Sequence, residues 1–192
     1  MEQNGNQPNI KAILNGDAQA FSKLVDDYKN LVFTVALRML KNTEEAEEVA
    51  QDTFIKVFKS LKNFKGDAKF STWIYRIAYN ACLDRIKKNK KEFANSSIDE
   101  LEGFEIKDMS NALDTIMASE KRQLVRKCVE SLSSTDAALI TFFYFEEKNL
   151  KELGEILNLT ENTVKVRLFR ARARLGAILK KQLSPVITQR YG

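Results

Sequence analysis

The stretch that decides the fold is residues 149–175, NLKELGEILNLTENTVKVRLFRARARL, where two amphipathic segments flank a tight turn. Asn149 is followed three residues later by Glu152, a spacing typical of a helix N-cap. After a turn at residues 158–159, Thr160 is placed to cap a second helix. Two helices joined by so short a turn cross at a steep angle. The sequence therefore predicts a helix-turn-helix.

The second of these helices has an apolar core stripe and a basic outer face. On its outer side, Val166 and Phe169 lie between cations, which suits a DNA major groove, where apolar groups touch thymine methyls and cations reach guanine or phosphate. Between residues 160 and 181, seven basic residues stand against Glu161 alone. A solvated basic face on a purely structural helix is the alternative. We predict these DNA-contacting residues: Thr163, Lys165, Val166, Arg167, Phe169 and Arg170.

Composition restricts the chemistry. The chain has 192 residues, a net charge of +5 and no histidine, so a Ser-His or Cys-His nucleophile pair and a His-ligated metal site are excluded. Cys82 and Cys128 have no CxxC spacing and are expected to be small buried hydrophobic residues in a reducing compartment. No apolar run is long enough for a signal peptide or a membrane span. We expect a cytoplasmic protein that is not an enzyme, needs no cofactor and does not insert into membranes.

Seven glycines, two prolines and apolar spacing of 3.6 residues favour an all-α chain. The pattern predicts core helices over residues 21–40, 42–63 and 71–88, with Asn42 capping the second. Periodicity weakens between residues 91 and 119, which are rich in acidic side chains and are predicted to be a flexible linker. We expect two small helical domains, this linker and a loose tail, with the following boundaries: 1–90, 91–119, 120–183 and 184–192.

The first predicted domain has a nucleic-acid face of its own. In the helix over residues 71–88, the only Trp, Trp73, falls opposite the inward stripe, beside Arg76 and Asn80. Basic residues interleaved with aromatic rings are typical of surfaces that bind unpaired DNA. The alternative is that these rings fill a small helical core. We expect the exposed-Trp arrangement.

The predicted helix over residues 42–63 is acidic, whereas the next one, over residues 71–88, is basic. Glu48, Gln51, Asp52 and Ile55 lie together off its buried face, while Phe58 belongs to the predicted buried stripe. Two carboxylates one turn apart repel one another, and a basic protein surface would relieve the repulsion. The sequence therefore predicts a protein-docking face here.

Residues 46–88, AEEVAQDTFIKVFKSLKNFKGDAKFSTWIYRIAYNACLDRIKK, and residues 150–175 resemble the second and fourth conserved regions of extracytoplasmic-function sigma factors. Their order, the acidic segment between them and the chain length match as well. The resemblance implies a non-enzymatic alternative sigma factor that directs RNA polymerase to promoters and helps to open them. It departs from the family pattern in two places: Gly154 replaces a more usual alanine, and Val166 a small polar residue.

The resemblance also implies partners for each face. The acidic face would dock on clamp helices of the largest subunit of core RNA polymerase, the basic helix that Thr160 caps would read the minus-35 element, and the linker would approach the RNA exit path. An anti-sigma factor, often membrane-anchored, is a further implied partner. Residues implied to melt and hold the minus-10 element are Phe64, Lys69, Ser71, Thr72, Trp73, Arg76 and Asn80.

Two other function classes account for fewer features of the sequence. A stand-alone helix-turn-helix regulator, usually a dimer on a palindrome, would explain residues 149–181 but not the acidic helix or the Trp-bearing one. A nucleic-acid enzyme would need a metal cluster, a histidine or a glycine-rich phosphate loop, and the sequence offers none of these motifs.

Overall fold

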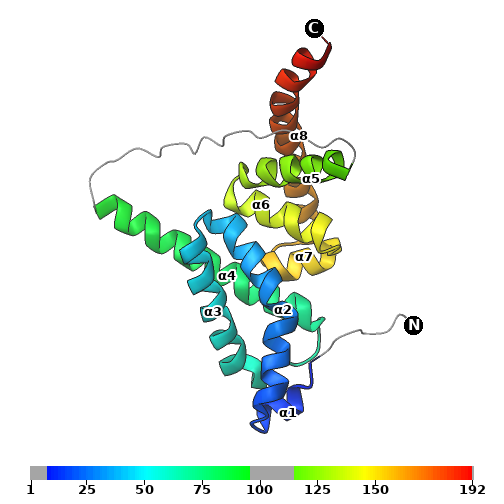
Figure 1. Ribbon diagram of the computed structural model, residues 1–192. Coiled ribbons are helices and arrows are strands. Elements are labelled where there is room, and N and C mark those ends of the chain that lie inside the picture. Colours follow the sequence, from blue (N-terminus) through cyan, green and yellow to red (C-terminus); the bar gives the residue numbers. More distant parts are fainter. Residues whose placement is uncertain (1–7, 96–114, 192) are drawn as a thin grey trace.

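The fold is seen in a computed structural model that describes residues 8–95 and 115–191 (Figure 1). Within these two ranges every regular element is helical and no strand occurs, which confirms the all-α prediction. The bounds of the helices up to residue 95 are α1 Ile10–Leu14, α2 Ala18–Leu40, α3 Thr43–Ser60, a 3₁₀ turn Leu61–Asn63, and α4 Phe70–Asn95. Those from residue 115 onward are α5 Thr115–Glu130, α6 Ser134–Ile140, a π-helical turn Thr141–Phe145, α7 Leu150–Leu157 and α8 Glu161–Tyr191.

Short polar side chains fix where several of these helices begin. Asn42 Oδ1 accepts the Glu45 N–H at 2.9 Å, so the predicted cap of α3 is confirmed. Ser133 Oγ likewise accepts the Asp136 N–H at the start of α6. At α7 the predicted cap is a full capping box, because Asn149 and Glu152 each accept the other's backbone N–H.

Two helix ends differ from the sequence predictions. Helix α4 extends to Asn95 and α5 begins at Thr115, so helix occupies both ends of the predicted linker. The middle of that linker, residues 96–114, lies outside the described residues. Helix α8 continues to Tyr191 through the segment predicted to be a loose tail, because proline disfavours a helix at its preceding residue without forbidding one.

The two groups of helices pack against each other as well as internally. Helix α7 lies against α4, and α6 lies against α2 (Figure 1). Buried Arg38 of α2 donates to Thr141 Oγ1 at 2.8 Å, and Ser134 Oγ donates to the Met39 carbonyl at 2.7 Å. Apolar residues of both groups form one continuous core. The two groups of described helices therefore pack on each other through a shared apolar and hydrogen-bonded interface.

Candidate nucleic-acid interface

The turn between α7 and α8 sets the angle of the predicted DNA-reading helix. Asn158 ends α7 in the left-handed region, at φ 54°, and the Leu159 N–H donates to the Gly154 carbonyl at 2.9 Å. A Cβ added at Gly154 would lie 2.7 Å from the Leu159 carbonyl oxygen. Gly154 is therefore required by the tight turn, which explains why the usual alanine is absent. Thr160 Oγ1 accepts the Thr163 N–H at 3.3 Å and caps α8 as predicted.

The side chains on the outer face of α8 are exposed to solvent, as the helical spacing of its apolar residues predicts. Val164, Leu168 and Ala171 are buried, whereas the side chains on the opposite side point to solvent. Phe169 is 72% exposed and Val166 is 49% exposed, so two apolar groups stand uncovered on this face. Two neighbouring apolar side chains left uncovered among cations fit the predicted DNA-contacting face better than the alternative of a core helix with a solvated basic side. Lys165, Arg167 and Arg170 are exposed beside them, and Thr163 is half-buried.

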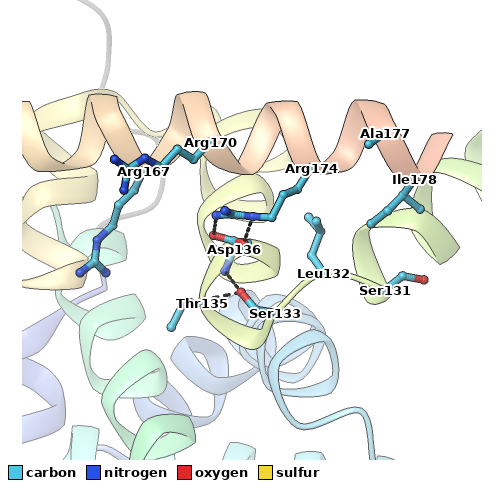
Figure 2. Close-up of a pocket in the computed structure, with 10 residues that line it drawn as sticks. All are labelled: Ser131, Leu132, Ser133, Thr135, Asp136, Arg167, Arg170, Arg174, Ala177 and Ile178. Atoms are coloured by element: carbon cyan, nitrogen blue, oxygen red, sulfur yellow. Dashed lines mark hydrogen bonds and ion pairs between the residues drawn. The ribbon is translucent and has the colours of Figure 1, made fainter. Parts of the chain in front are cut away.

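One flank of α8 carries an arginine-lined pocket of about 730 Å³ (Figure 2). Arg167, Arg170 and Arg174 line it together with the turn between α5 and α6. Figure 2 shows Arg174 reaching Asp136, to which its Nε and Nη2 donate at 2.7 and 2.9 Å. This bidentate pair joins α8 to α6 and was not anticipated from the sequence, because the two residues are 38 positions apart. It leaves Arg167 and Arg170 as the cations of the pocket that do not bind Asp136.

The other flank of α8 rests on aromatic rings. The Arg172 guanidinium lies 5.0 Å from the centre of the Phe143 ring and 5.3 Å from that of Tyr144. Both rings belong to the π-helical turn Thr141–Phe145. Arg172 therefore has a packing role that its place in the basic run did not reveal.

On α4 the predicted minus-10 face is only partly open. Arg76 and Asn80, one turn apart, are exposed as predicted. Trp73, predicted to be exposed, is instead half-buried, with its ring centre 5.3 Å from that of Phe64 and 5.4 Å from that of Phe70. The prediction is wrong in this respect because Phe64, from the loop before α4, and Phe70 pack against the indole.

Three further residues of the predicted minus-10 set are paired or buried within the protein, two of them by contacts with the second group of helices. Lys69 Nζ lies 3.0 Å from Glu152 Oε1 of α7. Ser71 Oγ accepts a hydrogen bond from Lys148 Nζ at 3.2 Å. Thr72 is only 2% exposed. These side chains are thus engaged within the protein, a condition that no local sequence pattern could reveal.

On α3 the predicted docking residues Glu48, Gln51, Asp52 and Ile55 are all exposed. Arg85 Nη2 of α4 donates to Glu48 Oε2 at 2.7 Å, and Arg85 Nη1 lies 3.7 Å from Glu45 Oε1. The charge pairing expected from a partner therefore comes in part from this chain.

Phe58, also on α3, was predicted to be buried but is 54% exposed. Its ring meets Phe21 edge-on at 5.0 Å, so it lies at the rim of the core. With Ile55, which is 51% exposed, it adds apolar surface beside the acidic residues. Helical spacing alone assigned Phe58 to the buried stripe, but the ring lies at the edge of that stripe and is half in solvent.

The described residues contain no group of three or more acidic or thiol side chains arranged to hold a metal ion. Cys82 and Cys128 are free thiols and buried, as predicted. Burial raises the pKa of the Cys82 thiol to about 12 and also raises that of Cys128. Among the helices that the structure describes, none combines the length and apolarity needed to cross a bilayer.

Comparison with known proteins identifies the family of this chain. The model of sigma-70 region 2 matches residues 24–92, and that of sigma-70 region 4 matches residues 122–175. The ECF RNA polymerase sigma factor SigW of Bacillus subtilis (strain 168) is 35% identical over 182 residues, which cover 91% of this chain and 94% of SigW. The chain belongs to the extracytoplasmic-function (ECF) sigma factors. It is an alternative sigma factor for transcription initiation, and the predicted resemblance is confirmed.

Other sigma factors are similar to this chain over nearly its whole length. The ECF RNA polymerase sigma-E factor of Salmonella typhimurium (strain LT2) is 32% identical over 177 residues, covering 89% of this chain and 92% of that protein. The RNA polymerase sigma-H factor of Pseudomonas aeruginosa is 28% identical over 189 residues, covering 95% of this chain and 98% of that factor.

Two solved structures share the fold of this sigma factor. CnrH in complex with the cytosolic domain of CnrY superposes with a TM-score of 0.59 at 21% identity, over 90% of this chain and 95% of that one. The sigma factor RpoE in complex with the anti-sigma factor NepR, from Bartonella quintana, gives a TM-score of 0.64 at 20% identity, over 85% of this chain and 98% of that one.

Proposed function

We propose that this ECF sigma factor binds core RNA polymerase through α3, reads duplex minus-35 DNA with α8 and holds unpaired minus-10 DNA on α4. The observation that carries the proposal is the open outer face of α8, where Phe169 is 72% exposed between cations. A large apolar side chain left uncovered on a basic helix is unfavourable in water and favourable against thymine methyl groups.

At the minus-35 element, α8 would lie in the major groove with Val166 and Phe169 against the bases. Lys165 and Arg170 flank this pair and would reach guanine edges or phosphates. Arg167, in the pocket beside the groove face, suits a backbone phosphate better than a base.

At the minus-10 element, α4 would bind a base drawn out of the stack. Arg76 and Asn80 are exposed one turn apart, so a cation for the backbone and an amide for a base edge share one face. Trp73 is held by Phe64 and Phe70, so its ring would serve as a rigid wedge that presents one edge to the DNA.

For core binding we propose the face of α3 formed by Glu48, Gln51, Asp52 and Ile55. Exposed carboxylates steer a basic partner, and the exposed apolar Ile55 supplies area that is buried on contact. Arg85, already bound to Glu48, would be shared with or displaced by the incoming surface.

We further propose two domains divided at residues 91–119, an anti-sigma partner, a cytoplasmic location and no enzymatic activity. The anti-sigma partner is supported by solved relatives of the same fold that are bound to such factors, or to a cytosolic domain. The absence of enzymatic activity is supported by the sigma factors that this chain resembles over most of its length.

Transcription by purified core polymerase on genomic DNA, with and without the protein, tests the function. Start sites that depend on the protein are expected, and their absence would contradict the proposal. Arg170→Ala and Lys165→Ala should each weaken minus-35-dependent promoters by about 1 to 3 kcal/mol if they contact bases. Lys180→Ala, an exposed cation of α8 beyond the proposed contacts, is the matched control and should leave the promoter ranking unchanged.

The docking face is tested separately. Glu48→Lys combined with Asp52→Lys should abolish co-purification with core polymerase at physiological salt while helical content stays the same, because both side chains are exposed. Glu44→Lys combined with Glu47→Lys makes the same charge change on the same helix and is the control. Retained binding by the first variant would move the docking face elsewhere.

A further inference from the structure

The pocket beside α8 has a charged end and an apolar end (Figure 2). Arg167 and Arg170 line one end, and Ala177 and Ile178, further along the same helix, line the other. The pocket volume of about 730 Å³ lies within the range of about 300 to 1,000 Å³ that is usual for small-molecule sites. There is therefore room for a ligand that has one anionic end and one less polar end.

The two arginines at the charged end have no acidic partner. They lie three residues apart on α8, so their like charges are on the same side of the helix and repel one another. Among the residues that the structure describes, no carboxylate forms an ion pair with Arg167 or Arg170, whereas Arg174 is bound to Asp136. An anion would relieve the repulsion, and guanidinium groups bind phosphate oxygens through paired N–H donors. The charged end therefore favours a phosphate group.

The middle of the pocket is held in shape by contacts between α6 and α8. Arg174 donates two hydrogen bonds to Asp136, which is only 8% exposed. The same carboxylate repels a further anion, so a phosphate is confined to the charged end. Beside this pair, the hydroxyls of Ser133 and Thr135 lie 3.4 Å apart on exposed side chains, where they can bind the hydroxyl groups of a sugar. Because an ion pair already joins the two helices, the pocket exists before a ligand arrives.

The other end of the pocket offers an apolar surface. Leu132, from the turn between α5 and α6, is almost fully buried, and Ile178 of α8 is half-buried. Ala177 is exposed at the edge. A flat ring laid over these side chains would remove apolar surface from water, which favours binding. This end therefore suits the base of a nucleotide better than a second charged group.

Duplex DNA does not account for the whole pocket. A recognition helix places its N-terminal residues in the major groove, which is about 12 Å wide. Ile178 is 17 residues beyond Glu161, the first residue of α8, and therefore lies about 25 Å along the helix axis. A duplex held by the first turns of α8 would leave the apolar end uncovered. The pocket as a whole thus fits a small molecule better than it fits DNA.

From this arrangement we propose that the pocket binds a nucleoside phosphate, with the phosphate at Arg167 and Arg170, the sugar at the two hydroxyls near the start of α6, and the base over the apolar end. Because the same two arginines are proposed to contact minus-35 DNA, the bound nucleotide competes with that DNA. This competition rests on the proposed function, whereas the binding of the nucleotide does not. The helix that reads the promoter thereby carries a site through which a small molecule lowers promoter affinity.

Calorimetric titration of the full chain with ADP measures the binding. Arg170→Gln removes one phosphate contact and should weaken ADP binding about tenfold or more. Lys165→Gln removes the same charge from an exposed position of the same helix outside the pocket, and it is the matched control. Adenosine, which has no phosphate, should bind at least about tenfold more weakly than ADP. An equal loss in both variants, or no ADP binding at about 1 mM, would overturn the proposal.

The apolar end is tested by filling it. Ala177→Trp places a large ring at an exposed position of the pocket and keeps all three arginines, so it should weaken ADP binding about tenfold. Ala173→Trp, also exposed on α8 but outside the pocket, is the control and should leave ADP affinity unchanged. Inorganic pyrophosphate has no base and should bind both variants as it binds the parent chain, which also shows that they are folded. Unchanged ADP affinity in Ala177→Trp would overturn the proposed site.

Competition is measured with duplex DNA from a promoter found in the transcription assay. With ADP at about ten times its dissociation constant, the affinity of the chain for this duplex should fall about tenfold, and that of Ala177→Trp by no more than about twofold. Undiminished DNA binding at this ADP concentration would overturn the competition. The ADP titration needs no promoter, so it stands if the proposed function fails, and a failed titration leaves promoter-dependent transcription intact.

Discussion

The two DNA faces proposed for this sigma factor differ in how the free protein presents them. On α8, Phe169 and Val166 stand in solvent, and the packing of the rest of the chain leaves them uncovered. At the start of α4, Lys69 is paired with Glu152 and Thr72 is buried. The comparison teaches that one proposed face can stand in solvent while part of the other, at Lys69 and Thr72, is taken up by packing and pairing within the chain, although Arg76 and Asn80 stay exposed.

The largest effect on stability is expected from a substitution in the turn between α7 and α8, which holds the open face of α8 in place. Gly154→Ala places a Cβ 2.7 Å from the Leu159 carbonyl oxygen, which cannot move without opening the turn. We expect a loss of about 2 to 3 kcal/mol in unfolding free energy, measured by urea denaturation. Gly176→Ala, also in a helix of this half, meets no atom within 4 Å and should stabilise by about 0.5 to 1 kcal/mol. Equal effects of the two changes would contradict the tight-turn explanation.

The next effect compares one aromatic residue from each face. Trp73→Ala should lower the unfolding free energy by about 1 to 2 kcal/mol, less than full burial would give, because the indole packs on Phe64 and Phe70 while half-buried. Phe169→Ala should change it by less than about 0.5 kcal/mol, since the ring is 72% exposed. Both variants are compared by thermal unfolding. A more damaging Phe169→Ala would reverse the assignment of open and covered faces.

A smaller effect is expected from Ser71, which lies on the partly covered face at the start of α4. Ser71→Ala removes the acceptor of the Lys148 hydrogen bond across the interface and should lower the unfolding free energy by about 0.5 to 1 kcal/mol. The change is measured by urea denaturation. Lys165→Ala on the open face is the control and should leave the unfolding free energy unaltered.

The smallest effect concerns the two thiols, one in each half. Burial raises the pKa of Cys82 to about 12, so native Cys82 should react with iodoacetamide at pH 8 more slowly than Cys128 and far more slowly than an unfolded thiol with a pKa of 9.0. Because the folded pKa exceeds the unfolded one, the thiol's contribution to stability is fully present below pH 9 and is lost as pH rises toward 12. Mass spectrometry of the labelled peptides gives the rates. Faster labelling of Cys82 would show that the first half opens locally before the second.

Several features were determined by the sequence alone because they depend on neighbours along the chain. The caps at Asn42, Asn149 and Thr160 each involve a residue three positions away, and all three form as predicted. The outer face of α8 follows from helical spacing within one helix, so Val166 and Phe169 were placed correctly. Family membership likewise rests on short motifs, and the comparisons confirm it.

Tertiary structure alone decided what covers each face. Spacing cannot tell that Phe64 folds over Trp73, that Arg85 neutralises Glu48, or that Phe58 lies at the rim of the core. The pairing of Lys69 with Glu152 joins residues from two domains, and an ion pair of this kind depends on how those domains dock. The physical reason is the distance along the chain over which each interaction acts. Caps and helical faces are set by residues within one or two turns, whereas burial and charge pairing depend on which distant surfaces the fold brings within a few ångströms.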